Sequence, residues 1–136
     1  MQKYMDEGFS TDKLRAELAD PGSAFYFAVL EEQVIGYLKL NTGAAQTELK
    51  DDRALEIERI YVLQKYQGQK VGQLLYQKAV EVARQRQAGY IWLGVWDQNG
   101  KAIRFYEKQG FVPFDQHVFK LGDDEQIDIM MKLPLH

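Results

Sequence analysis

Gln67-Gly68-Gln69-Lys70-Val71-Gly72 is the stretch of sequence that decides the fold, because of the segments on either side of it. Residues 55–63 before it form an apolar run typical of a strand, and residues 71–87 after it repeat apolar side chains at helical spacing. A strand, a glycine-containing loop and a helix N-terminus in this order gather unpaired N–H groups and the positive end of a helix dipole. Such a loop can hold a pyrophosphate without a metal ion. An ordinary glycine-containing turn would look the same, and the stretch is neither a Walker loop nor the GxGxxG dinucleotide pattern.

The composition narrows the classes of protein that fit. The chain has 136 residues, 46% of them hydrophobic and 27% charged, which fits one globular domain spanning residues 1–136. A net charge of −3 argues against a nucleic-acid partner and is compatible with a cationic substrate. The absence of cysteine excludes a thiol nucleophile and a thiolate metal site, and two histidines, His117 and His136, do not make a metal centre. No apolar run reaches the roughly 20 residues of a membrane span and no signal peptide opens the chain, so we expect a cytoplasmic protein without a membrane partner.

Hydrophobic periodicity predicts a mixed α/β domain with one parallel strand pair in an otherwise antiparallel sheet. Residues 55–63 and 90–96 are the expected parallel pair, because a strand–helix–strand unit pairs its strands in parallel. The polar segment 41–53 is expected to be an exposed loop. The expected helices are residues 71–87, residues 99–109 and a short one from Ser10 or Thr11 to Leu18. The other expected strands are residues 24–30 and 33–40, joined at Glu31-Glu32, and residues 111–119 and 127–133, joined across Gly122-Asp123-Asp124.

Two glutamates interrupt the strand 55–63. Glu56 and Glu58 lie on one of its faces by the two-residue period. Carboxylates on an otherwise apolar strand suit a general base, acting directly or through water, whose pKa partial burial would raise. A solvated strand face, or ion pairs with Arg53 and Arg59, accounts for the same pattern.

The helix 99–109 carries a second candidate pair. Asn99 and Tyr106 fall on one helical face with Ala102 (or Ile103) between them, about 10 Å apart. A ligand along that face would meet an amide at one end and a phenol at the other. Phe105 and Tyr106 also fit a pair of core aromatics, which is the usual place of such side chains.

Taken together, these segments resemble the GCN5-related N-acetyltransferases, the GNAT superfamily. The similarity covers residues 55–111, including the strand Glu56-Ile57-Glu58-Arg59-Ile60-Tyr61-Val62, the loop after it, and the helix that ends in the family's FYxKxGF pattern, residues 105–111. Within the superfamily the chain looks most like the bacterial spermidine/spermine N-acetyltransferases, on residues 55–61, 91–96 and 122–126.

The resemblance implies where acetyl-CoA, the cosubstrate, would bind. The strands 55–63 and 90–96 would splay apart, with the pantetheine pairing to main chain around Ile60 and Val62 and the pyrophosphate on residues 67–72. Asn99 would contact the pantetheine arm. The cofactor-binding residues expected in this way are Ile60, Tyr61, Val62, Gln67, Gly68, Gln69, Lys70, Val71, Gly72, Asn99, Tyr106 and Lys108.

The resemblance also implies direct transfer of the acetyl group to a primary amine in a ternary complex. An alkylammonium titrates at about 10.4 and must lose a proton before it attacks. Glu58 and Glu56 are expected to remove it through water, with Glu58 favoured because it lies nearer the end of the strand. Tyr106 would give a proton or a hydrogen bond to the CoA thiolate, and the N–H of Ile60 or Val62 would polarise the thioester carbonyl. The catalytic residues expected are therefore Tyr106, Glu58 and Glu56, with no metal.

The acceptor expected from the resemblance is a small-molecule amine, a polyamine such as spermidine or spermine. Acidic side chains near the last strand suit a polyamine, although a solvated hairpin turn accounts for them as well; they are Asp123, Asp124, Glu125 and Asp128. Acetylation of protein N-termini or lysines, and a CoA-binding regulatory module with little turnover, are the alternatives.

Two features depart from the family pattern. The family's loop reads Arg/Gln-x-x-Gly-x-Gly/Ala, and Lys70 stands where the first of those glycines is expected. Backbone N–H donation survives this change, but the lysine side chain must turn away or bind phosphate. The strand and helix that precede residues 10–18 in the family are mostly missing, so either the chain is truncated or its sheet has an exposed edge that invites a second subunit, a homodimer.

Overall fold

The computed structural model describes residues 21–135, so the helix expected from Ser10 or Thr11 to Leu18 lies outside the described residues. The strands are β1 (Ser23–Leu30), β2 (Gln33–Thr42), β3 (Ala54–Val62), β4 (Tyr90–Trp96), β5 (Val112–Leu121) and β6 (Asp124–Pro134). The helices are α3 (Val71–Gln85) and α4 (Gly100–Gln109), with single turns of 3₁₀-helix at Gly43–Ala45 and Gln64–Tyr66. These elements confirm the expected order and differ from it only at their ends.

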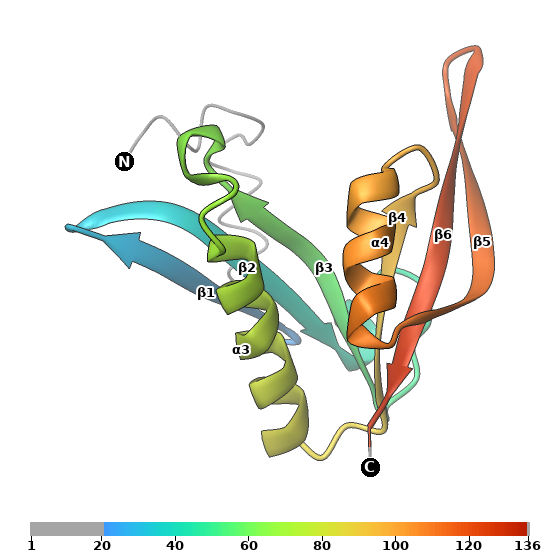
Figure 1. Ribbon diagram of the computed structural model, residues 1–136. Helices are drawn as coiled ribbons and strands as arrows, with labels where there is room; N and C mark the ends of the chain where they lie inside the picture. Colours follow the sequence, from blue (N-terminus) through green and yellow to red (C-terminus); the bar gives the residue numbers. More distant parts are fainter. Residues whose placement is uncertain (1–20, 136) are drawn as a thin grey trace.

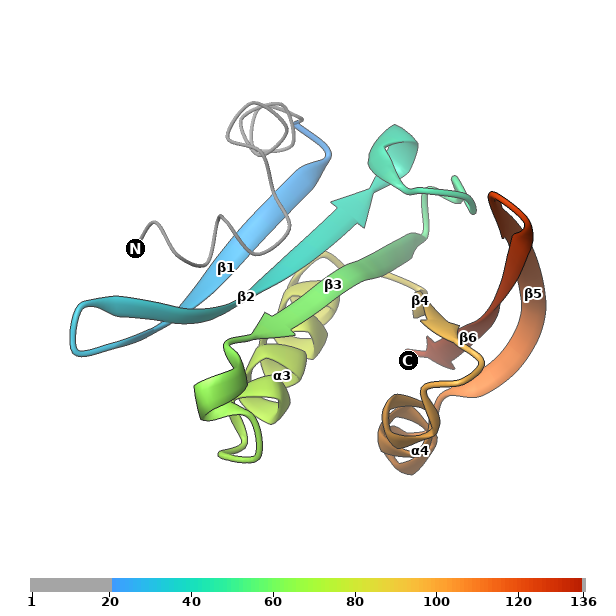
Figure 2. The ribbon, with the colours of Figure 1, turned by 90° about the horizontal axis from the view of Figure 1, so that it is seen from above.

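The strands form one six-stranded sheet in the order β1-β2-β3-β4-β6-β5. β3 and β4 are parallel, and the other neighbours are antiparallel, as the strand–helix–strand order predicted. Figures 1 and 2 show both helices on the same face of the sheet, α3 over β1–β3 and α4 beside β4. The described sheet ends in β1 on one side and β5 on the other, and the pairing of an edge with a second subunit stays a prediction.

The hydrophobic core lies between this face and the helices. α3 contributes Leu75, Ala79, Val82 and Ala83, whose three- and four-residue spacing puts them on one side of the helix. The sheet contributes buried side chains from β2, β3 and β4, among them Leu38, Leu40, Leu55, Ile57, Ile91 and Leu93. The splayed strands β3 and β4 are therefore held by packing on the helix side as well as by their own pairing.

The segment 41–53 is not the exposed loop that its polarity predicted. Asn41 belongs to β2 and is fully buried, and Gln46 is almost fully buried. Gln46 Oε1 accepts from Trp92 Nε1 at 2.7 Å, and Gln46 Nε2 donates to the carbonyl of Asp51 at 2.9 Å. A polar side chain that finds such partners can be buried at little cost, and the partner on β4 is 46 residues away in the sequence.

Within residues 21–135, no helix has the length and apolarity to cross a membrane.

Candidate functional site

The site begins where β3 and β4 separate. Their paired residues end at Glu56 opposite Trp92, although β3 continues to Val62 and β4 to Trp96. Two clefts open there, and both are lined by Ile60, Asn99, Ala102 and Tyr106. One of about 440 Å³, the loop cleft, is also lined by Val62, Tyr66, Gln67, Gly68, Gly72 and Phe105. The other of about 480 Å³, the strand cleft, is also lined by Tyr37, Glu58, Arg59, Tyr61, Gly94 and Trp96.

The loop cleft ends at the N-terminus of α3. The first bond of the helix runs from Leu74 N to the carbonyl of Lys70 at 3.1 Å, so the N–H groups of residues 71–73 precede the helical ladder. No side chain caps this N-terminus within the described residues. A Cβ added at Gly68 or Gly72 would meet no described atom within 4 Å, which leaves space in front of the loop. The sequence therefore folds into an open helix N-terminus, a geometry that suits an anion, and pyrophosphate binding there stays a prediction.

Lys70 takes a left-handed backbone conformation, which favours glycine. Its φ is +67° and its ψ is 15°, the left-handed region, at the residue before α3. This conformation costs a non-glycine residue about 1 kcal/mol, which the fold accepts here. Neither cleft is lined by the Lys70 side chain, so the irregular residue keeps the shape of the loop without blocking it.

Helix α4 places one amide and one phenol between the clefts. Asn99 caps the helix, with its Oδ1 accepting from Ala102 N at 3.2 Å, and the cap does not use its Nδ2. Tyr106 lies two turns further on, and its ring packs edge-on against those of Tyr76 and Phe105. Burial, with a smaller contribution from Tyr76, raises the pKa of Tyr106 to about 12. The phenol is therefore protonated throughout the neutral range and can donate a hydrogen bond.

A β-bulge aims Glu58 at the strand cleft. Lys39 on β2 pairs with Arg59 and the next residue, Leu40, pairs with Ile57, so Glu58 is the extra residue of β3. The expected two-residue alternation therefore holds up to Glu58 and changes face after it. Ile60 packs against the core, whereas Arg59 lies over the ring of Tyr37 in the strand cleft.

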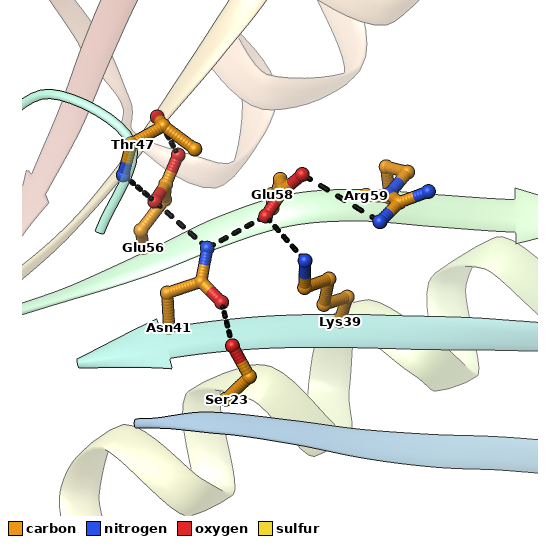
Figure 3. A network of polar contacts seen from close by, with 7 residues as sticks. All are labelled: Ser23, Lys39, Asn41, Thr47, Glu56, Glu58 and Arg59. Atoms are coloured by element: carbon orange, nitrogen blue, oxygen red, sulfur yellow. Dashed lines mark hydrogen bonds and ion pairs between the residues drawn. The ribbon is translucent and has the colours of Figure 1, made fainter. Parts of the chain in front are cut away.

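Glu58 is ionised, which corrects the expectation of a raised pKa. Burial raises the pKa of Glu58, but hydrogen bonds from Asn41 and Lys39 and the charges of Lys39 and Arg59 outweigh it and leave the pKa below its ordinary value. Asn41 Nδ2 and Lys39 Nζ lie 2.8 and 2.9 Å from Oε1, and an Arg59 nitrogen lies 3.6 Å from Oε2. Figure 3 shows these partners converging on the carboxylate.

Glu56 is a buried structural carboxylate and lines neither cleft. Its Oε1 accepts from Thr47 N at 2.8 Å and from Asn41 Nδ2 at 3.0 Å, and its Oε2 accepts from the Thr47 hydroxyl at 2.6 Å. Its position away from the clefts does not support a direct role as a base, and a role through water stays a prediction.

Several other expected residues lie apart from the clefts. The side chain of Val71 is in the core, and Lys108 is exposed in the last turn of α4, at the far end of the helix from Asn99. Gln69 donates its N–H to the carbonyl of Tyr66 and lines neither cleft. The residues at the β5–β6 turn, Asp123–Glu125, are exposed, and Figure 1 shows this hairpin projecting away from the helices.

The sequence did not single out Tyr37 and Trp96, which the structure adds to the strand cleft. Tyr37 lies opposite Tyr61 in the pairing of β2 with β3, so knowledge of the register between these strands would have placed Tyr37 at the cleft. Trp96 ends the apolar run of β4 and is half exposed. The described residues contain no group of three or more His, Asp and Glu side chains that could hold a metal ion.

The site thus combines a splayed parallel strand pair, an open helix N-terminus and a buried phenol between two clefts. Residues 1–111 match the acetyltransferase (GNAT) family, and the chain belongs to that family. It is an N-acetyltransferase that uses acetyl-CoA.

Three relatives of this chain carry three different names. An uncharacterized N-acetyltransferase of Lactobacillus delbrueckii subsp. lactis is 43% identical over 135 residues, which cover 99% of this chain and 78% of that protein. Streptothricin acetyltransferase of Streptomyces lavendulae is 31% identical over 109 residues, 79% of this chain and 54% of that one. N-acetylaspartate synthetase of Danio rerio is 30% identical over 111 residues, 79% of this chain and 37% of that one. Named relatives of this kind support the superfamily but not the closer resemblance to polyamine acetyltransferases.

One solved structure shows the same fold with the cosubstrate bound. It is a putative streptothricin acetyltransferase from Bacillus anthracis in complex with acetyl coenzyme A, with a TM-score of 0.73 and 26% identity over 89% of this chain and 67% of that one.

Proposed function

We propose that the chain transfers an acetyl group from acetyl-CoA, bound in the loop cleft, directly to a primary amine bound in the strand cleft. The observation that carries this proposal is that Tyr106 and Ile60 line both clefts. A thioester held between them would face the CoA side and the acceptor side at once. The chain has no cysteine and so cannot form a thiol acyl-enzyme, which agrees with direct transfer in a ternary complex.

The proposed CoA contacts follow the loop cleft from end to end. The N–H groups at the start of α3 and the open surface of Gly68 and Gly72 would receive the pyrophosphate. Main chain at Ile60 and Val62 would pair with the pantetheine, and Asn99 Nδ2 would donate to one of its carbonyls. The Val62 carbonyl now accepts from Gln67 Nε2 at 3.0 Å, so it is an acceptor that the pantetheine amide can use instead.

Tyr106 would stabilise the leaving thiolate with a hydrogen bond. A thiol titrates at about 8.5, so a phenol with a pKa of about 12 is the weaker acid by more than three orders of magnitude. Full transfer of the phenolic proton would therefore be unfavourable, and donation without transfer is the role that fits. The N–H of Ile60 or Val62 would polarise the thioester carbonyl.

Glu58 would attract the acceptor ammonium and pass its proton to water. Burial raises the pKa of Glu58, but its hydrogen bonds and nearby positive charges bring it below the ordinary value, so the carboxylate would hold the proton only in passing and release it to the buffered solvent. An ionised carboxylate within a partly aromatic cleft, with Tyr37 and Trp96 nearby, suits a cationic amine such as a polyamine.

Arg59 favours a second class of acceptor. Its guanidinium lines the strand cleft together with Glu58. An amino acid offers an ammonium group to one of them and a carboxylate to the other. This acceptor class is compatible with the similarity to an N-acetylaspartate synthetase.

The test is release of CoA thiol from acetyl-CoA over a panel of polyamines, monoamines, amino acids and peptides, with acetyl-CoA binding measured in parallel. We expect turnover with a cationic small amine, or with an amino acid if Arg59 dominates. Glu58→Gln should lower kcat/KM for a cationic amine by roughly tenfold or more and leave acetyl-CoA binding unchanged. Turnover with peptides alone would point to a protein acetyltransferase. Binding without acetylation of any amine would leave only a CoA-binding module.

A further inference from the structure

We propose that Asn41 is a positioning residue for the acceptor site, because it bridges Glu58 to the buried Glu56 and so fixes the Glu58 carboxylate at the strand cleft. The inference rests on the proposed function in one respect, the contact between Glu58 and the acceptor amine. Asn41 touches neither cleft and would act only through Glu58.

Asn41 is held in one orientation by its partners. It is 0% exposed on β2, and its single amide nitrogen donates to Glu58 Oε1 at 2.8 Å and to Glu56 Oε1 at 3.0 Å. Its oxygen accepts from the Ser23 hydroxyl on β1 at 2.7 Å. Two carboxylates accept and cannot donate, so only the NH₂ side of the amide can face them. Figure 3 shows the resulting row of side chains from Ser23 through Asn41 to the two glutamates.

The far end of this row is fixed to the segment that follows β2. Thr47 donates two hydrogen bonds to Glu56, one from its hydroxyl to Oε2 and one from its backbone N–H to Oε1. Glu56 is 3% exposed and cannot turn towards solvent without losing these bonds. It therefore gives Asn41 a rigid anchor, and Asn41 extends that anchor to Glu58.

Asn41 differs from the other partners of Glu58 in joining it to a second fixed group. As the extra residue of a bulge, Glu58 has no opposite residue on β2. Lys39, which is also buried, contacts the same Oε1 at 2.9 Å, and the Arg59 contact of 3.6 Å is loose. Asn41, with a short and buried side chain, is the partner that ties the carboxylate to Glu56.

The bridge also separates two negative charges. The charged and titratable groups that face Glu58 are Lys39 from β2, Arg59 from its own strand and Glu56 across Asn41, and Tyr37, Tyr61 and Tyr106 share its cleft. Removing Asn41 leaves Glu58 with one hydrogen-bond donor fewer and without a dipole between it and Glu56. The pKa of Glu58 should then rise.

The experiment compares Asn41→Leu with the unchanged protein in the thiol-release assay, using the best amine from the panel. We expect kcat/KM for the amine to fall roughly tenfold, while KM for acetyl-CoA stays within about twofold. The acid limb of the kcat/KM profile for the amine should move to higher pH by about one unit, since a group that titrates higher is lost earlier on acidification.

Two controls separate positioning from stability and from the proposed function. Thr47→Val removes the hydroxyl bond to Oε2 of Glu56 and keeps the backbone N–H bond to Oε1, the oxygen that Asn41 contacts, so the anchor is weakened but not lost. It should lower the unfolding midpoint, and kcat/KM for the amine should fall much less than in Asn41→Leu. Glu58→Gln is measured alongside. A full rate in this variant removes Glu58 from acceptor binding, which is a failure of the proposed function rather than of the bridge.

Ser23→Ala keeps the test decisive if Asn41→Leu does not fold. It frees only the oxygen side of the Asn41 amide, on the outermost strand of the described sheet, and should lower kcat/KM for the amine about twofold to threefold with acetyl-CoA binding unchanged. The proposal is overturned if folded Asn41→Leu keeps both kcat/KM and pH profile while Glu58→Gln is impaired. It is equally overturned if Asn41→Leu does not fold and Ser23→Ala behaves as the unchanged protein.

Discussion

Tyr106 is the single residue whose chemistry the structure defines most closely, since its phenol is buried, lines both clefts and has a pKa of about 12. Tyr106→Phe removes the donor and keeps the ring packed against Tyr76. We expect kcat to fall by roughly 10²-fold, because the leaving thiolate loses its hydrogen bond, while the dissociation constant of CoA barely changes. Steady-state kinetics and calorimetric CoA binding measure the two quantities.

The raised pKa of Tyr106 also limits how this residue can affect the pH dependence of the rate. A phenol whose pKa is higher in the folded protein than its ordinary value of 10 stays neutral up to about pH 12. An alkaline fall of the rate below pH 10 therefore cannot come from Tyr106, and Tyr106→Phe should keep it. Loss of that limb in the variant would contradict the burial of the phenol.

Lys70 allows a test of backbone strain in the loop. Its φ of +67° is free for glycine and costs a lysine about 1 kcal/mol, which the added flexibility of glycine in the unfolded chain roughly cancels. Lys70→Gly should therefore change the free energy of unfolding by less than about 1 kcal/mol, whereas the β-branched Lys70→Val should lower it by about 1–2 kcal/mol. Urea unfolding at neutral pH compares them. Equal stability of the two variants would show that the loop relaxes out of this conformation.

At the scale of the elements, the sequence predicted most of the fold because its signals are local. The apolar run of β4, the helical period of α3 and the glycine that ends α4 each describe a stretch of adjacent residues. The burial of Gln46 depends on Trp92 in another strand, and no periodicity reports a contact across that distance.

The candidate site was predictable to the same extent. The loop, Asn99 and Tyr106 follow from motifs along the chain, and the structure brings them to two adjoining clefts. The direction of the Glu58 pKa shift was wrong because it depends on Asn41 and Lys39, which reach it only through the register of β2 and its bulge. Glu56 and Glu58 look alike in sequence. Thr47, in the segment 41–53, binds the carboxylate of Glu56 and makes it structural, whereas Glu58 stays at the strand cleft.

Asn99 links an element to the site, because it caps α4 and also lines both clefts. Asn99→Ser keeps a capping oxygen but loses the amide donor, whereas Asn99→Ala loses both. We expect Asn99→Ser to keep its stability and raise KM for acetyl-CoA by about threefold to tenfold. Asn99→Ala should show the same KM and unfold with about 1 kcal/mol less free energy. Identical KM values in Asn99→Ser and the unchanged protein would assign Asn99 to the cap alone.

The whole molecule consists of two halves of a sheet that meet at a short seam. β1–β3 with α3 and β4–β6 with α4 are joined by the pairs from Ala54–Tyr90 to Glu56–Trp92 and by packing of the two helices. Figure 2 shows β3 and β4 diverging beyond this seam. A ligand in the loop cleft would contact both halves, because the cleft takes residues from β3, the loop, α3 and α4.

Binding of acetyl-CoA should therefore stabilise the two halves together. At a free concentration about 100 times its dissociation constant, acetyl-CoA should add about 2.7 kcal/mol to the free energy of unfolding. Hydrogen exchange should slow at residues 57–62, whose edge has no partner in β4, and at residues 71–73, whose N–H groups would face the pyrophosphate. The β5–β6 hairpin is the internal control, since its outer end lies away from both clefts and should exchange at an unchanged rate. Stabilisation with no protection at either segment would mean that acetyl-CoA binds elsewhere, and the splayed seam would then have no role in holding it.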